Sequence, residues 1–348
     1  MNRKSVITIS ASVLVLVVIG FVYMRFFGYR DNGAKESVSF FAMDTYMTVS
    51  ANGPGAKETL SLVKEEIDTL DRLLNTENPE SPVYALNQGK TVSADSVLTN
   101  LVTVSSEYSS LTDGAFNVLV YPLVTEWGFI SKDYKVPESE RLKELCDLVA
   151  SSKIETDGAG QTLKLSEGAK IDFGAVAKGY ATERAVAVLK QSGINSALLN
   201  LGGNVYALGT KQNGDPWKVA IKHPGSESKY LGTLKVSDTA VITSGSYERY
   251  FERGGKRYHH IIDPATGRPA DTGLLSVTVV SKDPTLADAL STALFVMGLQ
   301  KATGFWRAHS DLFDFVACDE GGYTYVSEGL KSSFTPEDKL TTYTVTYK

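Results

Sequence analysis

A carboxylate and a hydroxyl stand four residues apart in an otherwise apolar stretch near the C-terminus. Asp288 and Thr292 lie within residues 286–293, where most neighbours are alanine or leucine. This spacing places both side chains on one side of a helix. A carboxylate in such surroundings must be paired, hydrogen-bonded or bound to a cation, and two oxygen donors suit Mg²⁺. The spacing leaves open that Asp288 caps a neighbouring loop and that Thr292 bonds back to its own helix.

A second segment, residues 171–180, has features of a phosphate site. It opens a helix expected over 175–191, and the free N–H groups at a helix N-terminus bind phosphate. Lys178 adds a positive charge one turn into that helix, and Asp172 just ahead of it can accept a hydrogen bond from a base or sugar. The Asp172-Phe173-Gly174 triplet is also found in kinases, but the other kinase motifs are missing. An ordinary capped helix with a surface lysine remains the alternative.

Three further motifs follow expected strands. The glycine pair at 202–203 lets backbone approach a ligand, although no third glycine opens a helix as a dinucleotide-binding fingerprint requires. Residues 243–247 and 258–264 end two strands, and the second holds two of the four histidines. A histidine beside a carboxylate can serve as a base. Zinc is disfavoured, because adjacent histidines on a strand point to opposite faces.

Apolar periodicity predicts the elements that must position these motifs. Helices are expected over 56–74, 95–110, 137–150, 175–191 and 283–297, the last with Asp283 as N-cap and Pro284 at its first position. Strands are expected over 39–50, 154–155, 162–165, 197–201, 217–221, 241–243, 258–262, 275–280, 313–318 and 323–326. Helices and strands alternate irregularly, and several strands are consecutive. The order predicts an α+β fold with mixed β-sheets and packed helices.

Composition sets the outer limits of function. The 348 residues are 43% hydrophobic and 22% charged, as in an ordinary globular protein of one large or two tightly joined domains. The net charge of −5 gives no support to a nucleic-acid partner. Cys146 and Cys318 lie far apart in the sequence. Two free thiols are favoured over one disulfide, because a large domain needs no covalent staple.

The N-terminus is strongly biased. Arg3 and Lys4 precede a run from 5 to 24 without a charged residue, and twenty helical residues span roughly 30 Å of hydrocarbon. We therefore expect a transmembrane anchor over 1–27, a linker over 28–37 and a single functional domain over 38–348. The body is expected outside the cell membrane. A removed signal peptide is the alternative, but the residues after the run make a poor cleavage site.

Seven collinear motifs together resemble the ApbE family of FAD:protein FMN transferases, or flavin transferases. The resemblance covers roughly residues 39–330, and seven motifs in order are far more specific than any one of them. They occupy residues 42–49, 112–129, 171–180, 200–204, 243–247, 260–269 and 286–293.

The resemblance implies an ApbE-like (T-fold-like) body with an FAD site and a magnesium site. The Ala175 carbonyl, Asp288 and Thr292 would hold Mg²⁺ against the FAD diphosphate, with His260 activating the acceptor hydroxyl. Further residues implied at the FAD site are Met43, Glu77, Ala115, Phe116, Asn117, Asp172, Lys178, Ser244, Gly245 and His260. FMN would pass from FAD to a Thr or Ser of a partner protein through a phosphoester bond, with release of AMP. The partner is expected among extracytoplasmic redox proteins.

Two residues depart from the family pattern, which usually has Gly where Asp44 stands and Asp where Asn117 stands. Neither is an implied metal ligand, so the implied activity is unchanged. Two other functions remain open. A Mg²⁺-dependent FAD pyrophosphatase would use the same residues with water as acceptor, and a surface FAD-binding protein would need no catalysis.

Overall fold

A nine-stranded sheet forms the centre of the computed structural model, which describes residues 35–157 and 160–348. All neighbouring strands are antiparallel except the last pair, which is parallel. The order across the sheet is β1 (Lys35–Ala42), β2 (Thr45–Asn52), β6 (Ser196–Leu201), β7 (Asn204–Leu208), β10 (Thr239–Gly245), β13 (Leu274–Ser281), β14 (Asp314–Asp319), β15 (Thr324–Ser327) and β17 (Thr342–Val345).

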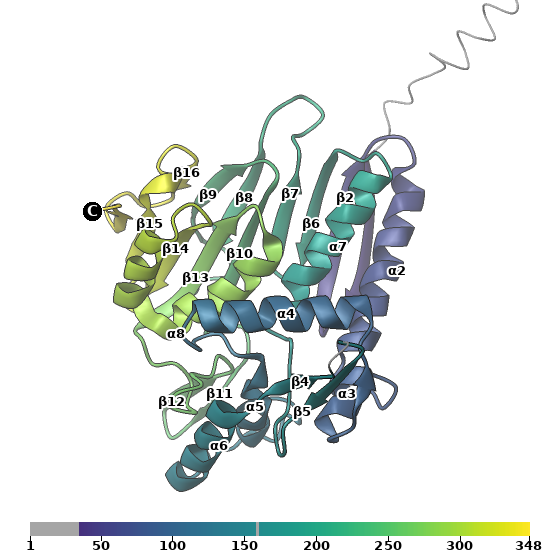
Figure 1. The fold of residues 1–348 in the computed structure, drawn as a ribbon. Helices are drawn as coiled ribbons and strands as arrows, with labels where there is room; N and C mark the ends of the chain where they lie inside the picture. The colour runs from purple at the N-terminus through teal and green to yellow at the C-terminus, as the bar shows by residue number, and fades with distance from the viewer. Residues whose placement is uncertain (1–34, 158–159) are drawn as a thin grey trace, which may run out of the picture.

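Three helices cover one face of this sheet (Figure 1). They are α2 (Ala56–Leu74), α7 (Ala177–Gln191) and α8 (Pro284–Ala308). The helix α4 (Ser96–Leu111) runs across the end of this layer and contacts α8. The main hydrophobic core lies between these helices and the sheet, with Met47, Tyr180 and Phe295 among its fully buried side chains.

A smaller sheet packs on the opposite face. It consists of β8 (Trp217–Lys222), β9 (Tyr230–Val236) and β16 (Phe334–Pro336), in the order β16-β9-β8. Alternate residues of β8 and β9 point inward and meet the outer face of β7, β10, β13 and β14 in a second core. The large sheet is therefore covered by helices on one side and partly by strands on the other, so its central strands are buried on both faces.

A lower part of the molecule lies beyond α4 (Figure 1). It contains the helices α3 (Pro82–Asn87), α5 (Tyr121–Glu126) and α6 (Ser139–Ser151) and the 3₁₀ turn η1 (Val118–Val120). Its strands are β3 (Val92–Ser93), β4 (Ile154–Thr156) and β5 (Thr162–Leu165), with the separate hairpin of β11 (Tyr250–Arg253) and β12 (Lys256–His259). A second 3₁₀ turn, η2 (Glu328–Leu330), follows β15. The hairpin packs against the region of α5 and α6 through aromatic side chains, namely Trp127, Phe129, Tyr134, Phe251 and Tyr258.

The α+β prediction is confirmed, and so are the local signals at α8. The Asp283 side chain caps α8 by accepting the N–H of Leu286, and Pro284 is the first helical residue. The helix was expected to end at 297, and its regular part does stop there because Gly298 has φ 73° and ψ 165°. The chain then continues as helix to Ala308, which the sequence did not predict. Cys146 and Cys318 are both free thiols, which is the outcome that the sequence analysis favours.

The single strand expected over 39–50 is wrong, because this segment forms the hairpin β1–β2. The chain reverses at Met43 and Asp44, which have φ of 48° and 56°. Two residues with positive φ form the turn that suits a two-residue hairpin. The strand β1 begins at Lys35, so residues 35–37 of the expected linker pair with β2. The strands β7 and β9 and the helix α3 were not predicted, and the strand expected to run to 262 ends at His259.

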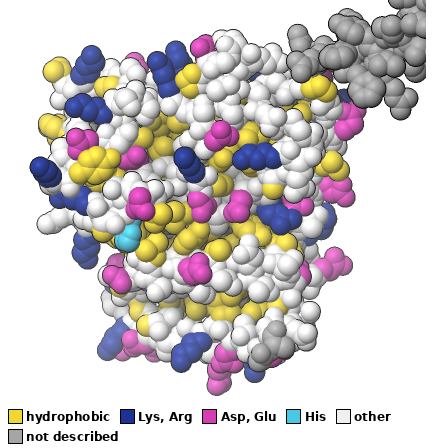
Figure 2. Space-filling model, turned by 45° about the horizontal axis from the view of Figure 1, so that its top comes forward, with side chains coloured by type: hydrophobic (Ala, Val, Ile, Leu, Met, Phe, Trp, Pro, Cys, Tyr) yellow, Lys and Arg dark blue, Asp and Glu magenta, His cyan; other side chains and the backbone are white. Residues whose placement is uncertain are grey.

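The predicted membrane anchor over 1–27 lies outside the described residues. Within the described part of the chain, no helix has the length and apolar character needed to cross a membrane. On the face shown in Figure 2, basic and acidic side chains are interspersed, and hydrophobic side chains lie in hollows between them.

Candidate active site

A cavity of about 520 Å³ opens where the ends of β2, β6, β7 and β10 meet the first turn of α7 and the N-terminal half of α8. Its volume is in the range of small-molecule sites. Twelve of the thirteen predicted site residues line it: Met43, Ala115, Phe116, Asn117, Asp172, Ala175, Lys178, Ser244, Gly245, His260, Asp288 and Thr292. The thirteenth, Glu77, is exposed in the loop between α2 and α3 and does not line the cavity. Segments far apart in sequence thus form one site.

The carboxylate of Asp288 lies at the contact between α7 and α8. Its side chain is almost fully buried, at 4% exposure, and its Oδ2 accepts the Gly179 N–H at 2.8 Å. The Lys178 Nζ lies 4.0 Å from Oδ1. Gly179 permits this approach, because a Cβ there would lie 2.3 Å from the Pro284 carbonyl oxygen and 2.6 Å from the Asp288 Cβ. The buried charge is therefore hydrogen-bonded and faces a cation.

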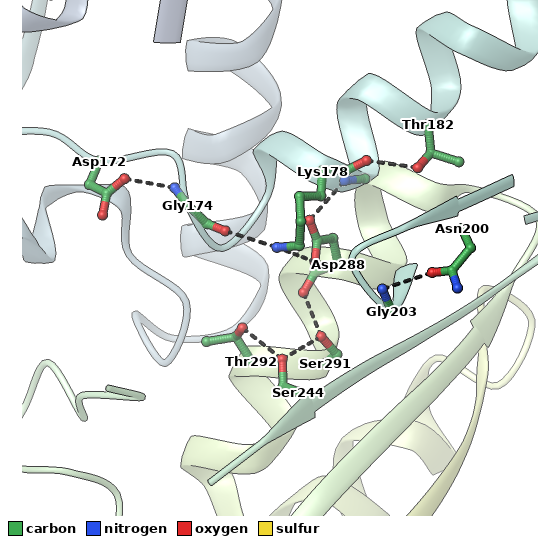
Figure 3. Close-up of polar contacts among 11 residues, drawn as sticks. Asp172, Gly174, Lys178, Thr182, Asn200, Gly203, Ser244, Asp288, Ser291 and Thr292 are labelled. Carbon is green, nitrogen blue, oxygen red and sulfur yellow. Dashed lines mark hydrogen bonds and ion pairs between the residues drawn. The ribbon is translucent and has the colours of Figure 1, made fainter. Parts of the chain in front are cut away.

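Three hydroxyls continue this polar wall along α8 (Figure 3). Ser244, from β10, lies 2.7 Å from the Ser291 hydroxyl and 3.1 Å from that of Thr292. Ser291 donates to the Asp288 carbonyl oxygen at 2.8 Å. Since Ser291 uses its proton there, it accepts from Ser244, and Thr292 keeps its own proton for Ser244 or a ligand. The Thr292 hydroxyl therefore contacts Ser244 on the sheet and does not merely bond back to its own helix.

The loop before α7 forms the opposite part of this wall. The Asp172 Oδ1 accepts the Gly174 N–H at 2.8 Å, and Lys178 donates to the Gly174 carbonyl oxygen at 3.4 Å. Burial raises the pKa of Asp172, while the Gly174 N–H and the charges of Arg249 and Lys178 lower it. The loop is thus folded around its own carboxylate, and Lys178 reaches toward both the loop and α8.

His260 follows β12 and has a defined tautomer. Its Nδ1 lies 3.2 Å from the Arg249 carbonyl oxygen, which also accepts the His260 backbone N–H at 3.1 Å. A carbonyl oxygen only accepts, so Nδ1 carries the proton and Nε2 is left with a free lone pair. Burial lowers the pKa of His260 well below its usual value, and the Arg249 charge lowers it further. The ring is therefore neutral near pH 7 and can accept a proton.

The donor set fits the magnesium ion that the family resemblance implies. Asp288, Thr292 and Ala175 line one cavity, and Mg²⁺ prefers a few oxygen ligands completed by water or phosphate. No group of three or more His, Cys, Asp or Glu side chains elsewhere in the described residues forms an alternative metal site. The expected set contains one carboxylate only, so it leaves coordination positions for phosphate oxygens.

The structure explains both departures from the family pattern. Asp44 has φ 56°, a left-handed conformation that glycine adopts most easily and aspartate tolerates. The Asn117 Oδ1 accepts the Leu119 N–H at 2.8 Å and caps η1, which an aspartate would do equally well. Both substitutions therefore preserve the local backbone.

Gly179 and Arg249 are among the residues of the site that were not singled out from sequence. Gly179 spaces α7 from α8, and a glycine inside a helix that is otherwise rich in helix formers signals close packing. Arg249 lines the cavity, and its charge lowers the pKa of both Asp172 and His260. No local pattern distinguishes it from the other arginines of the 249–257 hairpin region.

Fold and site together define an α+β protein with one cavity, in which Asp288, Lys178 and Thr292 lie beside apolar side chains. The family model described as "ApbE family" matches residues 43–315. A relative from Klebsiella pneumoniae named FAD:protein FMN transferase is 33% identical over 283 residues, which cover 80% of this chain and 87% of the relative.

Solved structures give the same result. The ApbE protein of Thermotoga maritima matches with a TM-score of 0.80 and 30% identity, covering 86% of this chain and 98% of that one. The flavinyl transferase ApbE of Pseudomonas stutzeri matches with a TM-score of 0.74 and 29% identity, covering 84% and 93%. The chain belongs to the ApbE family.

Proposed function

We propose that this chain is an FAD:protein FMN transferase that requires Mg²⁺ and attaches FMN to a Thr or Ser hydroxyl of a partner protein. The observation that carries the proposal is the position of Asp288, buried at the junction of α7 and α8, with Lys178 and Thr292 beside it in one cavity. A buried carboxylate that shares a cavity wall with a lysine and a hydroxyl suits a metal-bound diphosphate.

The reaction needs positioning more than covalent catalysis. The acceptor oxygen attacks the phosphorus on the FMN side of the diphosphate, the bond from that phosphorus to the bridging oxygen breaks, and AMP leaves with that oxygen. His260 Nε2 takes the proton of the acceptor hydroxyl, since Nδ1 is held by the Arg249 carbonyl. Lys178 and Arg249, both lining the cavity, supply positive charge toward the diphosphate.

The metal would be held by the Ala175 carbonyl oxygen, Asp288 and Thr292. When bound, it supplies positive charge that neutralises the diphosphate and the leaving phosphate. Ser244 orients Thr292 through the hydroxyl contact at 3.1 Å. Gly179 holds the Asp288 carboxylate in place through its N–H.

The cellular setting belongs to the same proposal. The uncharged run from 5 to 24 would anchor the chain in the cell membrane with its body outside, where the acceptor would be an extracytoplasmic redox protein. Fractionation of cells that express the full chain, with added protease, tests this. Membrane-bound protein that resists protease from outside in intact cells would contradict it.

The activity is tested by incubating the purified protein with FAD, Mg²⁺ and a Thr-containing acceptor domain, and by reading intact mass and released AMP. A gain of one FMN on the acceptor, lost with EDTA, is the expected result. AMP release without acceptor labelling would instead favour the pyrophosphatase. Tight FAD binding without AMP under any condition would leave only a flavin-binding protein.

The pH dependence of transfer should follow His260. A base works only when neutral, and its lowered pKa moves protonation to more acidic conditions than the usual 6.5. We expect the kcat/KM for acceptor labelling to stay near its maximum at about pH 6.5 and to fall only below it. A half-maximal rate at or above about pH 6.5 would contradict this. His260→Gln, which cannot act as this base, should remove the acidic limb together with most of the rate.

A further inference from the structure

We propose that the side-chain amide of Asn204 donates a hydrogen bond to a phosphate oxygen of the bound flavin nucleotide. Asn204 is the first residue of β7, is 2% exposed and lines the cavity. Its Nδ2 has no hydrogen-bond partner among the described residues. A buried amide nitrogen without a partner is rare in folded proteins, and a ligand in the cavity that Asn204 lines would supply the missing partner.

The other buried polar atoms without partners do not share this position. Within the described part of the chain they are the hydroxyls of Ser105 and Ser276, and neither residue lines this cavity. A hydroxyl can rotate toward a weak local acceptor, whereas an amide presents two N–H donors in a fixed plane. Of these three residues, Asn204 is therefore the one that has an unpaired donor and also lines the ligand cavity.

The surroundings of Asn204 favour an anionic partner. Side chains alternate along β7, so Asn204 shares a face with Tyr206 and Leu208, which pack in the core that includes α7. Lys178 lies in the first turn of α7 and lines the same cavity. In the turn before β7, the Gly203 N–H is already used by the Asn200 side chain at 2.9 Å (Figure 3). The Asn204 amide is thus an unpaired donor in the same cavity as the Lys178 ammonium group.

This inference rests on FAD being the substrate, and it is tested by binding. Asn204→Leu removes the donor at similar volume, and Asn204→Asp replaces it with a carboxylate. FAD affinity is measured by quenching of flavin fluorescence at fixed Mg²⁺. We expect Asn204→Leu to weaken FAD binding about tenfold, as for a lost hydrogen bond to a charged group. Asn204→Asp should weaken it more, because a carboxylate repels a phosphate.

Controls separate a ligand contact from a structural one. Without FAD, the melting temperature of Asn204→Leu should not fall, because an unmet polar group is replaced by an apolar one. Ser105→Ala, which removes a buried unmet hydroxyl outside the cavity, should leave FAD affinity unchanged. Variants that bind FAD like the wild type would overturn the inference. Equal losses in the Leu and Asp variants would also overturn it, since they would indicate a neutral carbonyl partner.

Measurements of FAD binding and of acceptor labelling together distinguish a wrong proposed function from a wrong inference about Asn204. If wild-type protein binds FAD and loses affinity in both variants as expected, but labels no acceptor, Asn204 is still a phosphate ligand and the transferase proposal is wrong. If labelling occurs and the variants bind FAD normally, only the inference about Asn204 is wrong. A wild-type protein that binds no FAD would overturn both.

Discussion

Replacing Asp288 with asparagine is expected to reduce FMN transfer at least about 100-fold while leaving the fold intact, since loss of a metal ligand costs more than loss of a residue behind it. Asparagine keeps an oxygen that can accept the Gly179 N–H, which Asp288 now accepts at 2.8 Å. The change therefore removes the charge that would hold Mg²⁺ and face Lys178, but not the contact between α7 and α8. The rate of acceptor labelling at saturating FAD, with the melting temperature of each protein, measures the effect.

The matched control is Asp283→Asn in the same helix. Asp283 caps α8 through the Leu286 N–H, and asparagine caps a helix about as well as aspartate. Its transfer rate and melting temperature should stay close to those of the wild type. If Asp288→Asn transferred FMN within about tenfold of the wild type, the carboxylate would not be a ligand of an essential metal.

The features of α8 that the sequence predicts correctly are local. The cap at Asp283, the proline at the first position and the shared side of Asp288 and Thr292 all follow from spacing within one helix. The partners of these residues are distant. The bond between Gly179 and Asp288 spans 109 residues, and that between Ser244 and Ser291 spans 47. Local periodicity carries no information on such pairs, so only the resemblance brought the segments together.

The errors in the fold prediction arise where the local sequence is compatible with more than one backbone structure. Apolar and aromatic residues lie on both sides of the turn at Met43 and Asp44, and methionine does not normally mark a left-handed turn. Asp44 favours a turn, but no glycine follows it as in the usual two-residue hairpin, so the segment was predicted as one strand. The glycine pair at 202–203 was interpreted as a place where backbone approaches a ligand, and the buried strand β7 behind it lacks the alternation that indicates a strand.

Glu77 illustrates the limit of transfer from a family pattern. The resemblance implies it at the FAD site, yet its side chain is exposed and lies away from the cavity lining. Its backbone N–H is held by the Asn75 side chain at 2.8 Å, in the loop that joins α2 to α3. A direct role in FAD binding stays a prediction for this residue, whereas the other twelve share one cavity.

The second large effect is expected from Gly179→Ala, which adds one methyl group between α7 and α8. That carbon would lie 2.3 Å from the Pro284 carbonyl oxygen and 2.6 Å from the Asp288 Cβ, so the helices must separate. We expect the free energy of unfolding to fall by about 1–3 kcal/mol, as in other overpacked cores.

The same displacement should also lower the rate of FMN transfer, because Gly179 donates the hydrogen bond that holds the Asp288 carboxylate. A shift of about 1 Å in a catalytic group costs roughly 100-fold in rate, so transfer should fall by that order even at temperatures where the variant is folded. Gly304→Ala is the matched control, since Gly304 lies later in α8 with no atom within 4 Å of an added Cβ. That variant should gain about 0.5–1 kcal/mol of stability and keep its activity. Full stability and full transfer in Gly179→Ala would show that close contact of the two helices is not what positions Asp288.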